Sequence, residues 1–289
     1  MIASSWLRYT LFTTVAWGVW GALTGLPSEH GFPDTLTYVV WSLTMIPPAI
    51  WALRHASTDL NRDARSIVLG LAIGLLGGGG QLLLFRAVTL GPTYLIFPIV
   101  SLSPVITILL SLLLLRERTG RLGVAGIVLA VLSLPLFDYS PEASVQHYGM
   151  WFFLAIAVMI AWGLQAFFIK LANVTMSAES IFIYMMISGL LFIPIAWAMT
   201  DFSHPVNMGL SGPWLAAAIQ LLNAVGALLL VYAFRYGKAI VVSPLVNAGA
   251  PLLTALLSLG LAGALPGPYK LAGVALALAG ALLLSLQPE

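Results

Sequence analysis

Apolar runs about 20 residues long recur along the whole chain and constrain its fold more than any other feature. The hydrocarbon core of a bilayer is about 30 Å thick, and a helix needs roughly 20 apolar residues to cross it. Of the 289 residues, 60% are hydrophobic and 8% are charged, whereas soluble domains are about 45–50% apolar and about 25% charged. We therefore expect an all-α polytopic membrane protein with ten transmembrane helices, at residues 8–26, 35–53, 66–89, 92–115, 120–137, 149–171, 178–199, 212–234, 239–261 and 268–286.

The basic residues predict how the chain is oriented. When alternate loops are assigned to alternate sides, all but two of the 12 Lys and Arg residues fall on one side, and Arg86 and Lys270 fall on the other. Because positively charged loops stay in the cytoplasm, we expect cytoplasmic N- and C-termini and a location in the bacterial cytoplasmic (inner) membrane. The run that follows Arg8 is interpreted as a retained span rather than a signal peptide, because it is long enough to cross and lacks a cleavage motif.

Other features exclude several classes of function. The basic residues are scattered through loops and form no basic face, so we expect no nucleic-acid partner. The chain has no cysteine, which excludes disulfides and thiolate metal sites. The four histidines fall in loops or at the ends of runs without metal-ligand spacing, so we expect no metal and no cofactor.

The second half of the sequence is a divergent copy of the first. Ala16-Trp17-Gly18 corresponds to Ala161-Trp162-Gly163 at an offset of 145 residues. At an offset of 146, the matched pairs are Gly91 with Gly237, Pro98 with Pro244, and Ser101 with Asn247. Because five is odd, a copy that follows five spans enters the membrane from the opposite side. We expect two inverted five-helix repeats, at residues 1–140 and 141–289, which form one transmembrane domain and support alternating access to a site at the bilayer midplane.

The stretch from Leu84 to Gly91, the proline-broken span after it and the leucine run ending in Arg116-Glu117-Arg118 resemble the drug/metabolite transporter superfamily, specifically its EamA-type ten-span members. The resemblance covers essentially the whole chain and, on overall sequence character, is strongest to the YddG aromatic amino-acid exporters. It implies two five-span repeats and export of amino acids and other metabolites. In the second repeat the matching stretch, Leu261 to Leu265, has lost its charges, so this part of the pattern occurs once.

Tryptophans at matching positions are the first candidates for a binding site. One face of the first expected span carries, at helical spacing, Thr13, Trp17, Trp20 and Thr24. This face should point to the interior, since hydroxyl groups gain nothing from contact with lipid. Trp162 is the counterpart of Trp17, and Gln165 follows it. Packing or interfacial anchoring is the alternative role of such residues, above all for Trp20.

Prolines interrupt two spans at matching positions. The fourth expected span contains Tyr94, Pro98, Ser101 and Pro104, and the ninth contains Ser243, Pro244, Asn247 and Pro251. Each proline frees a backbone carbonyl, which in a membrane is tolerated only against protein or a water-filled cavity. We therefore expect the prolines to act in gating beside the central site, with static kinks as the alternative, and Ser101 and Asn247 to bind substrate.

Uncharged amides and aromatic rings complete the predicted cavity. Gln81 follows the glycine run 77–80, and Asn223 lies in the middle of the eighth span, where amides need partners. Substrate, water or a neighbouring helix could supply them. The glycine run itself is more typical of close helix packing than of a binding loop. The predicted substrate-binding residues are Trp17, Trp20, Tyr38, Gln81, Tyr94, Ser101, Trp162, Gln165, Tyr184, Asn223 and Asn247.

These patterns favour a transporter of amino acids, aromatic and other neutral ones, or similar small metabolites. No Asp or Glu lies at the centre of a span, which favours facilitated transport over ion coupling. Arg86 is either an inward-pointing partner for a carboxylate or, more in keeping with its place, a side chain that snorkels to the interface. A passive channel or scaffold is the alternative function, and a membrane-embedded enzyme is less favoured. The small-residue faces of spans 5 and 10 predict pairing with each other or with another chain, in a monomer or weak homo-oligomer.

Overall fold

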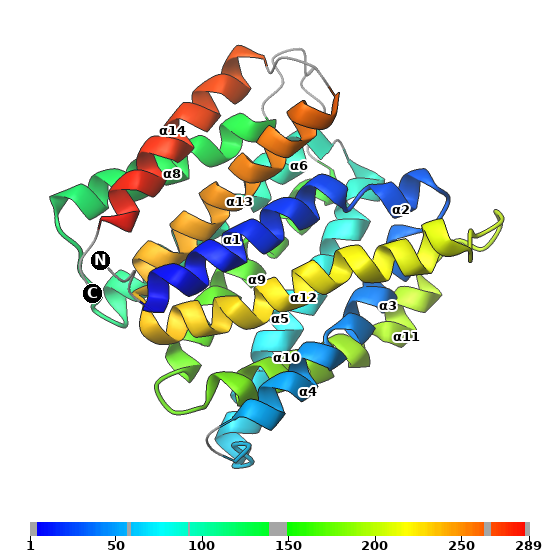
Figure 1. Ribbon diagram of the computed structural model, residues 1–289, viewed down its shortest axis with the longest axis horizontal. Coiled ribbons are helices and arrows are strands. Elements are labelled where there is room, and N and C mark those ends of the chain that lie inside the picture. Colours follow the sequence, from blue (N-terminus) through cyan, green and yellow to red (C-terminus); the bar gives the residue numbers. More distant parts are fainter. Residues whose placement is uncertain (1–4, 57–58, 92, 139–148, 263–266, 287–289) are drawn as a thin grey trace.

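The computed structural model describes residues 5–56, 59–91, 93–138, 149–262 and 267–286, and every regular element among them is helical (Figure 1). In chain order these are α1 (Ser5–Leu23), α2 (Leu26–Glu29), α3 (Asp34–Thr44), α4 (Ile46–His55), α5 (Ala64–Leu90), α6 (Thr93–Val100), α7 (Ser103–Leu113), α8 (Arg121–Asp138), α9 (Met150–Ala172), α10 (Ala178–Leu191), α11 (Ile193–Ala198), the π-helical turn η1 (Leu210–Trp214), α12 (Leu215–Tyr236), α13 (Ala239–Ala262) and α14 (Pro268–Ser285). The all-α class is confirmed for this part of the chain. The predicted boundary between residues 140 and 141 lies outside the described residues.

Six helical segments of the described ranges are long and apolar enough to cross a membrane, by length and composition. They are Asp34–His55, Ala64–Leu90, Met150–Ala172, Ala178–Ala198, Leu210–Tyr236 and Ala239–Leu257, and shorter apolar helices cover Ser103–Leu113, Arg121–Leu136 and Pro268–Leu284. Each predicted run contains at least one helix, but the number of spans stays a prediction.

Polar residues and glycines fix where the long helices begin and end. Asp63 precedes α5, and its carboxylate accepts a hydrogen bond from the Ser66 backbone N–H at 3.0 Å. Side-chain acceptors of this kind satisfy donors that the first helical turn leaves free. Helices α5 and α12 end at Gly91 and Gly237, which are matched in the two repeats.

Three predicted spans are broken, and only one of the breaks was expected. The fourth span divides at Ser101 and Leu102 into α6 and α7, with Pro104 in the first turn of α7. The second and seventh spans divide at Met45 and Phe192, and the helices that follow, α4 and α11, have Pro47 and Pro194 as their second residues. These prolines have no N–H to donate, so they fit the first turn of a new helix.

The ninth span differs from the fourth. Helix α13 continues through both of its prolines, Pro244 and Pro251, so the matched prolines do not produce matched breaks. The side chain of Pro98 lies outside the described residues.

Helices α8 and α14 pack against each other through small residues (Figure 1). A Cβ atom at Gly280 would lie 2.8 Å from the Ala130 backbone nitrogen, and one at Gly126 would lie 3.1 Å from the Gly280 carbonyl oxygen. Backbones come this close only where side chains are absent. Of the two pairings left open by the sequence, the structure shows these faces meeting each other.

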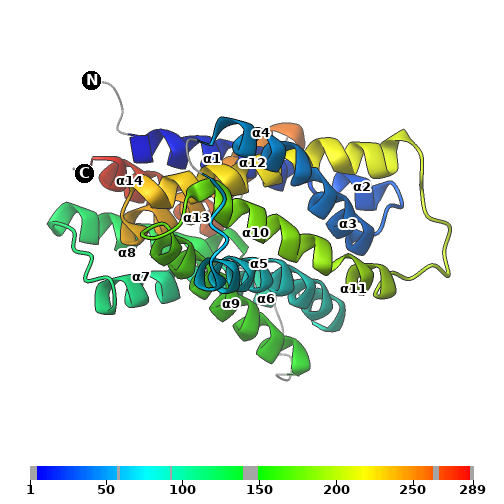
Figure 2. The same ribbon diagram turned by 90° about the horizontal axis from the view of Figure 1, so that it is seen from below.

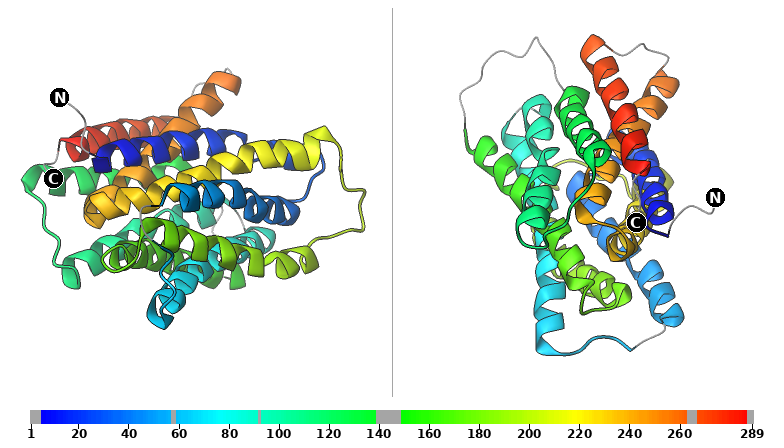
Figure 3. Two further views of the ribbon diagram at one scale, coloured as in Figure 1. Left: turned by 60° about the horizontal axis from the view of Figure 1, so that its bottom comes forward. Right: turned by 90° about the vertical axis from the view of Figure 1, so that its left-hand side faces the viewer.

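The two ends of the molecule are formed by different parts of the chain. Helix α1 begins and α14 ends at the same end, and the segment that joins α11 to η1 extends from the opposite end (Figure 2). The left view of Figure 3 shows the same arrangement from another side.

The two repeats make reciprocal contacts. Helix α1 packs on α12 and α13, and its counterpart α9 packs on α5, α6 and α7. Thr254 Oγ1 donates to the Gly18 carbonyl at 2.9 Å, and Thr107 Oγ1 donates to the Gly163 carbonyl at 3.0 Å. Gly18 and Gly163 are matched by the offset of 145 residues, and Thr107 and Thr254 lie 147 residues apart, one more than the offset that matches Ser101 with Asn247. The first helix of each repeat is therefore fixed in the same way by a hydroxyl of the other repeat.

Candidate functional site

The tryptophans of α1 are held by helix α12. The Trp17 indole N–H donates to the Asn223 backbone carbonyl at 3.2 Å, and the Trp20 indole N–H donates to Gln220 Oε1 at 3.1 Å. Gln220 also accepts from the Asn223 amide at 3.4 Å. A Cβ atom at Gly226 would lie 2.5 Å from the Trp17 ring, so a glycine is needed where the ring crosses α12. We call Trp17, Trp20, Gln220 and Asn223 the first tryptophan cluster.

An equivalent cluster joins α9 to α5. The Trp162 indole N–H donates to the Gly77 backbone carbonyl at 3.2 Å, the same length as its counterpart at Trp17. A Cβ atom at Gly80 would lie 2.6 Å from the Trp162 indole nitrogen, and one at Gly77 would collide with the Gln165 amide. We call Trp162 and Gln165, together with Gln81, which follows Gly80 in the sequence, the second tryptophan cluster.

The side chains of both clusters are partly exposed, although their residues lie away from the ends of their helices. Trp17, Asn223, Trp162, Gln165 and Gln81 are all half-buried. No hydrogen bond joins the Gln81 or Gln165 amide to another side chain within the described ranges. An uncharged amide in an apolar bundle needs water or a ligand where protein supplies no partner.

The glycine run 77–80 allows α5 to contact several helices at once. Gly77 and Gly80 face α9, as described above, whereas Gly78 faces Tyr38 and Gly79 faces Phe192. The Tyr38 hydroxyl oxygen lies 2.7 Å from the position of a Cβ atom at Gly78. Close packing is therefore the role of this run, in agreement with the sequence-based interpretation.

The residues predicted around the prolines are placed less uniformly. Asn247 on α13 is half-buried, and its amide donates to the Ser243 carbonyl one turn earlier at 2.9 Å. Ser101 is half-buried at the break between α6 and α7. The side chain of Tyr94, like that of Pro98, lies outside the described residues.

Tyr184 is placed apart from the two clusters. Its hydroxyl donates to the Asn61 backbone carbonyl at 2.6 Å, and its ring lies against Gly70, near the start of α5. These contacts join α10 to the loop before α5. We leave Tyr184 out of the site proposed below.

A polar group at one end of the bundle was not anticipated. Glu117 Oε1 lies 3.8 Å from Lys170 Nζ, and Glu117 Oε2 accepts from the Ile240 N–H at 3.1 Å, at the start of α13. Lys170 also donates to the carbonyls of Phe234 at 3.0 Å and Gly237 at 2.6 Å, at the end of α12. Glu117 and Lys170, which we call the terminal ion pair, thus tie the loop before α8 to three helices of the other repeat.

The sequence contained a signal for this group. Glu117 belongs to the charged motif that carries the family resemblance, and Lys170 is one of the basic residues that follow an apolar run. Their proximity depends on how the repeats pack, which no local pattern contains.

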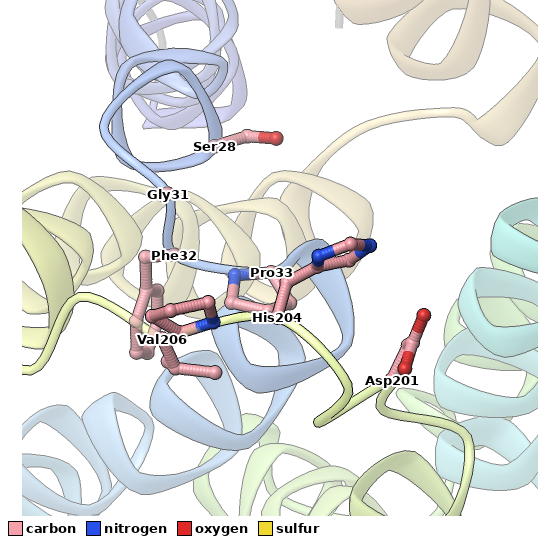
Figure 4. A pocket seen from close by; sticks show the side chains of 8 residues that line it. Ser28, Gly31, Phe32, Pro33, Asp201, His204 and Val206 are labelled. Atoms are coloured by element: carbon pink, nitrogen blue, oxygen red, sulfur yellow. The ribbon is translucent and has the colours of Figure 1, made fainter.

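The opposite end of the molecule carries a small polar pocket of about 280 Å³ (Figure 4). Asp201 and His204 project toward its open side, and Ser28 lies across from them. Hydrogen bonds from Ser203 lower the pKa of the exposed Asp201 carboxyl below its usual value. The pocket is built from Ser28 of α2 and from residues of the adjoining loops, and none of the residues of either tryptophan cluster lines it.

Within the described part of the chain, no group of three or more His, Asp or Glu side chains is placed to hold a metal ion.

An all-helical bundle with six segments long and apolar enough to cross a membrane defines the class of polytopic membrane proteins. A family model described as the EamA-like transporter family matches residues 4–137 and again residues 149–286. The chain belongs to the EamA-like transporter family, whose members are membrane transporters of small molecules rather than enzymes. It is accordingly an integral membrane protein.

Other comparisons establish the fold alone. A solved structure, described only as the crystal structure of a protein, superimposes with a TM-score of 0.79 at 20% sequence identity, covering 96% of this chain and 98% of that one. A search of curated proteins finds no match.

Proposed function

We propose that this transporter exports amino acids, aromatic and other neutral ones, by facilitated alternating access, and that the two tryptophan clusters line its substrate path. The observation that carries the proposal is the equivalence of the clusters. Each repeat places one tryptophan of its first helix on a backbone carbonyl of the other repeat at 3.2 Å, with uncharged amides beside it.

The chemistry of the clusters suits an amino acid. Both indole N–H groups are occupied by backbone carbonyls, so the rings are fixed and offer mainly their faces and edges. Such surfaces favour aromatic and aliphatic side chains. Gln81 and Gln165 supply donors and acceptors without net charge, which suits a zwitterionic head group.

The proposed topology has ten spans in two inverted repeats, residues 1–140 and 141–289, with both termini in the cytoplasm of a bacterial cell. The two family matches, at 4–137 and 149–286, support a division between them. The common end of α1 and α14 supports termini on one side of the membrane (Figure 2).

Alternating access requires that contacts at one end break while those at the other form. The terminal ion pair supports this proposal, because Glu117 of the first repeat holds the start of α13 in the second. The matching stretch of the second repeat has no charge. We therefore expect the two ends of the transporter to close by different contacts, which are ionic at one end and apolar at the other.

Counterflow in proteoliposomes tests the proposal directly. Vesicles loaded with each of the twenty amino acids should show saturable, stereoselective uptake of a labelled aromatic amino acid when the internal one is neutral and apolar. Trp17→Ala, Trp162→Ala and Asn247→Ala should reduce flux, whereas Trp214→Ala, which removes a side chain that is 68% exposed, should not.

Three outcomes would contradict it. Flux that does not saturate would indicate a channel, and wild-type flux in all three site variants would exclude the assigned residues. Uptake wholly dependent on an imposed proton gradient would exclude facilitated transport.

A further inference from the structure

A second cavity of about 730 Å³ lies on the side of the bundle, between α5, α9 and the helices α3 and α11. Gly79 and Gly80 contribute to its lining, as do Leu76 and Leu83 of α5 and Phe192 and Ile195 around the start of α11. Its volume falls in the range of about 300–1,000 Å³ that is typical of small-molecule sites. We call it the lateral groove.

Two glycines of α5 form part of the wall of the lateral groove. A Cβ atom at Gly79 would lie 3.3 Å from the Phe192 ring, and one at Gly80 would lie 2.6 Å from the Trp162 indole nitrogen. Because these two positions carry no side chain, the rings approach α5 closely and its backbone is part of the groove lining. Leu83, 37% exposed, and Ile195, 49% exposed, border the groove on the outer surface of the bundle, where lipid is the solvent.

One cation stands among these apolar groups. Arg86 lines the groove and is exposed, and no acidic residue shares the lining with it. Thr89 also lines the groove, but its hydroxyl donates to the Arg86 backbone carbonyl at 2.8 Å. Thr35 is likewise engaged, since its hydroxyl lies 2.7 Å from that of Thr200. Of the described lining groups, the Arg86 guanidinium is the one most able to bind an anion.

The groove has the length of one membrane leaflet. Helix α5 spans residues 64 to 90, so its middle is near Gly77. At 1.5 Å per residue, Gly79 and Gly80 lie within about 5 Å of the middle and Arg86 lies about 14 Å from it. Half of a bilayer core is about 15 Å thick. In a bilayer centred on the middle of an upright α5, the glycines would lie near the midplane and Arg86 would reach the level of the lipid phosphates.

We propose that the lateral groove is a binding site for an anionic phospholipid, with one acyl chain over Gly79 and Gly80 and the phosphate on Arg86. An acyl chain needs no hydrogen bonds, which suits the apolar lining, and a guanidinium binds phosphate through two parallel N–H donors. This proposal does not depend on the identity of the transported substrate.

The dependence of thermal stability on the lipid headgroup tests whether Arg86 recognises a negatively charged lipid. Phosphatidylglycerol and phosphatidylcholine with identical acyl chains are added to the purified protein in detergent, and the thermal unfolding midpoint is measured. Phosphatidylglycerol should raise the midpoint by several degrees more than phosphatidylcholine, because a ligand that binds only the folded state stabilises it. Arg86→Gln should abolish this difference. Lys270→Gln, which removes an exposed cation of α14, should keep it.

Fluorescence quenching by brominated acyl chains tests whether the lipid binds in the lateral groove. Because the chain has no cysteine, Ile195→Cys gives a single site for a fluorescent label at the groove, and Leu113→Cys gives a control on a side chain that is 72% exposed elsewhere. Brominated phosphatidylglycerol should quench the Ile195 label several-fold more strongly than brominated phosphatidylcholine, and should quench the Leu113 label equally with both.

Two results would overturn the proposal. One is equal stabilisation of the wild-type protein by both lipids. The other is a preference for phosphatidylglycerol that survives Arg86→Gln. Inorganic phosphate alone should give no stabilisation; if it matched the lipid, the site would be one for free anions.

Discussion

At the scale of single residues, the indole hydrogen bonds are the most direct link between sequence and site. We expect Trp17→Phe and Trp162→Phe to reduce counterflow by similar factors, because the two N–H groups make equivalent bonds of 3.2 Å. A hydrogen bond of this kind contributes about 0.5–1.5 kcal/mol, which corresponds to up to about tenfold in flux if it fixes the ring only in the transporting states. Trp214→Phe serves as the control. If one of the two variants kept full counterflow activity, the equivalence of the two indole hydrogen bonds would be structural and not functional.

The cap of α5 gives a prediction of pH dependence. Hydrogen bonds from Ser66 lower the pKa of Asp63 in the folded protein below its usual value. A carboxyl whose pKa is depressed on folding contributes stability above its unfolded pKa and loses it as pH falls through the folded pKa. Thermal unfolding should therefore show Asp63→Ala less stable than wild type near neutral pH, with the difference shrinking below about pH 4. Asp63→Asn, which keeps an acceptor, should lie between them.

The sequence predicted several residues of the proposed site but not their hydrogen-bond partners. The offset between the repeats placed Trp17 and Trp162 at equivalent positions, and the structure joins them to equivalent carbonyls. The pairing of Trp20 with Gln220 could not be predicted, because it depends on which face of α12 meets α1. Tyr184 looked like a cavity residue by type alone, whereas its hydroxyl is engaged by a loop carbonyl.

At the scale of elements, apolar length predicted the helices well and proline predicted the breaks poorly. A proline at an internal position can be accommodated by a continuous helix, as in α13, or can begin a new one, as in α4 and α11. Which occurs depends on whether neighbours satisfy the freed carbonyl. The breaks at Met45 and Phe192 had a signal in Pro47 and Pro194, each of which lies two residues after the break.

The terminal ion pair yields a prediction about the ends of α12 and α13. Glu117→Gln keeps an acceptor for the Ile240 N–H but loses the attraction to Lys170, and Glu117→Ala loses both. Thermal unfolding midpoints should therefore fall in the order wild type, Gln, Ala. The loss of the cap alone costs about 1 kcal/mol. Glu179→Gln, which removes a carboxylate bonded to Tyr232 in the same region, controls for general effects of lost charge.

The same variants separate a structural tie from a gate. If the pair closes one end of the transporter, Glu117→Gln should also change the counterflow rate while Glu179→Gln does not. Equal transport rates in both variants would leave the pair with a role in stability alone.

At the scale of the whole molecule, the inverted arrangement is the proposal on which alternating access depends, and the absence of cysteine makes it accessible to labelling. Exposed residues at the two ends provide the sites: Arg62 lies in the loop before α5, and His204 lies in the segment between α11 and η1. With an odd number of spans between them in the ten-span topology, the two positions face opposite compartments. In intact cells, a membrane-impermeant thiol reagent should label His204→Cys and should label Arg62→Cys only after permeabilisation. Labelling of both from outside would rule out this topology, since no rocking motion exchanges the sides on which whole loops lie.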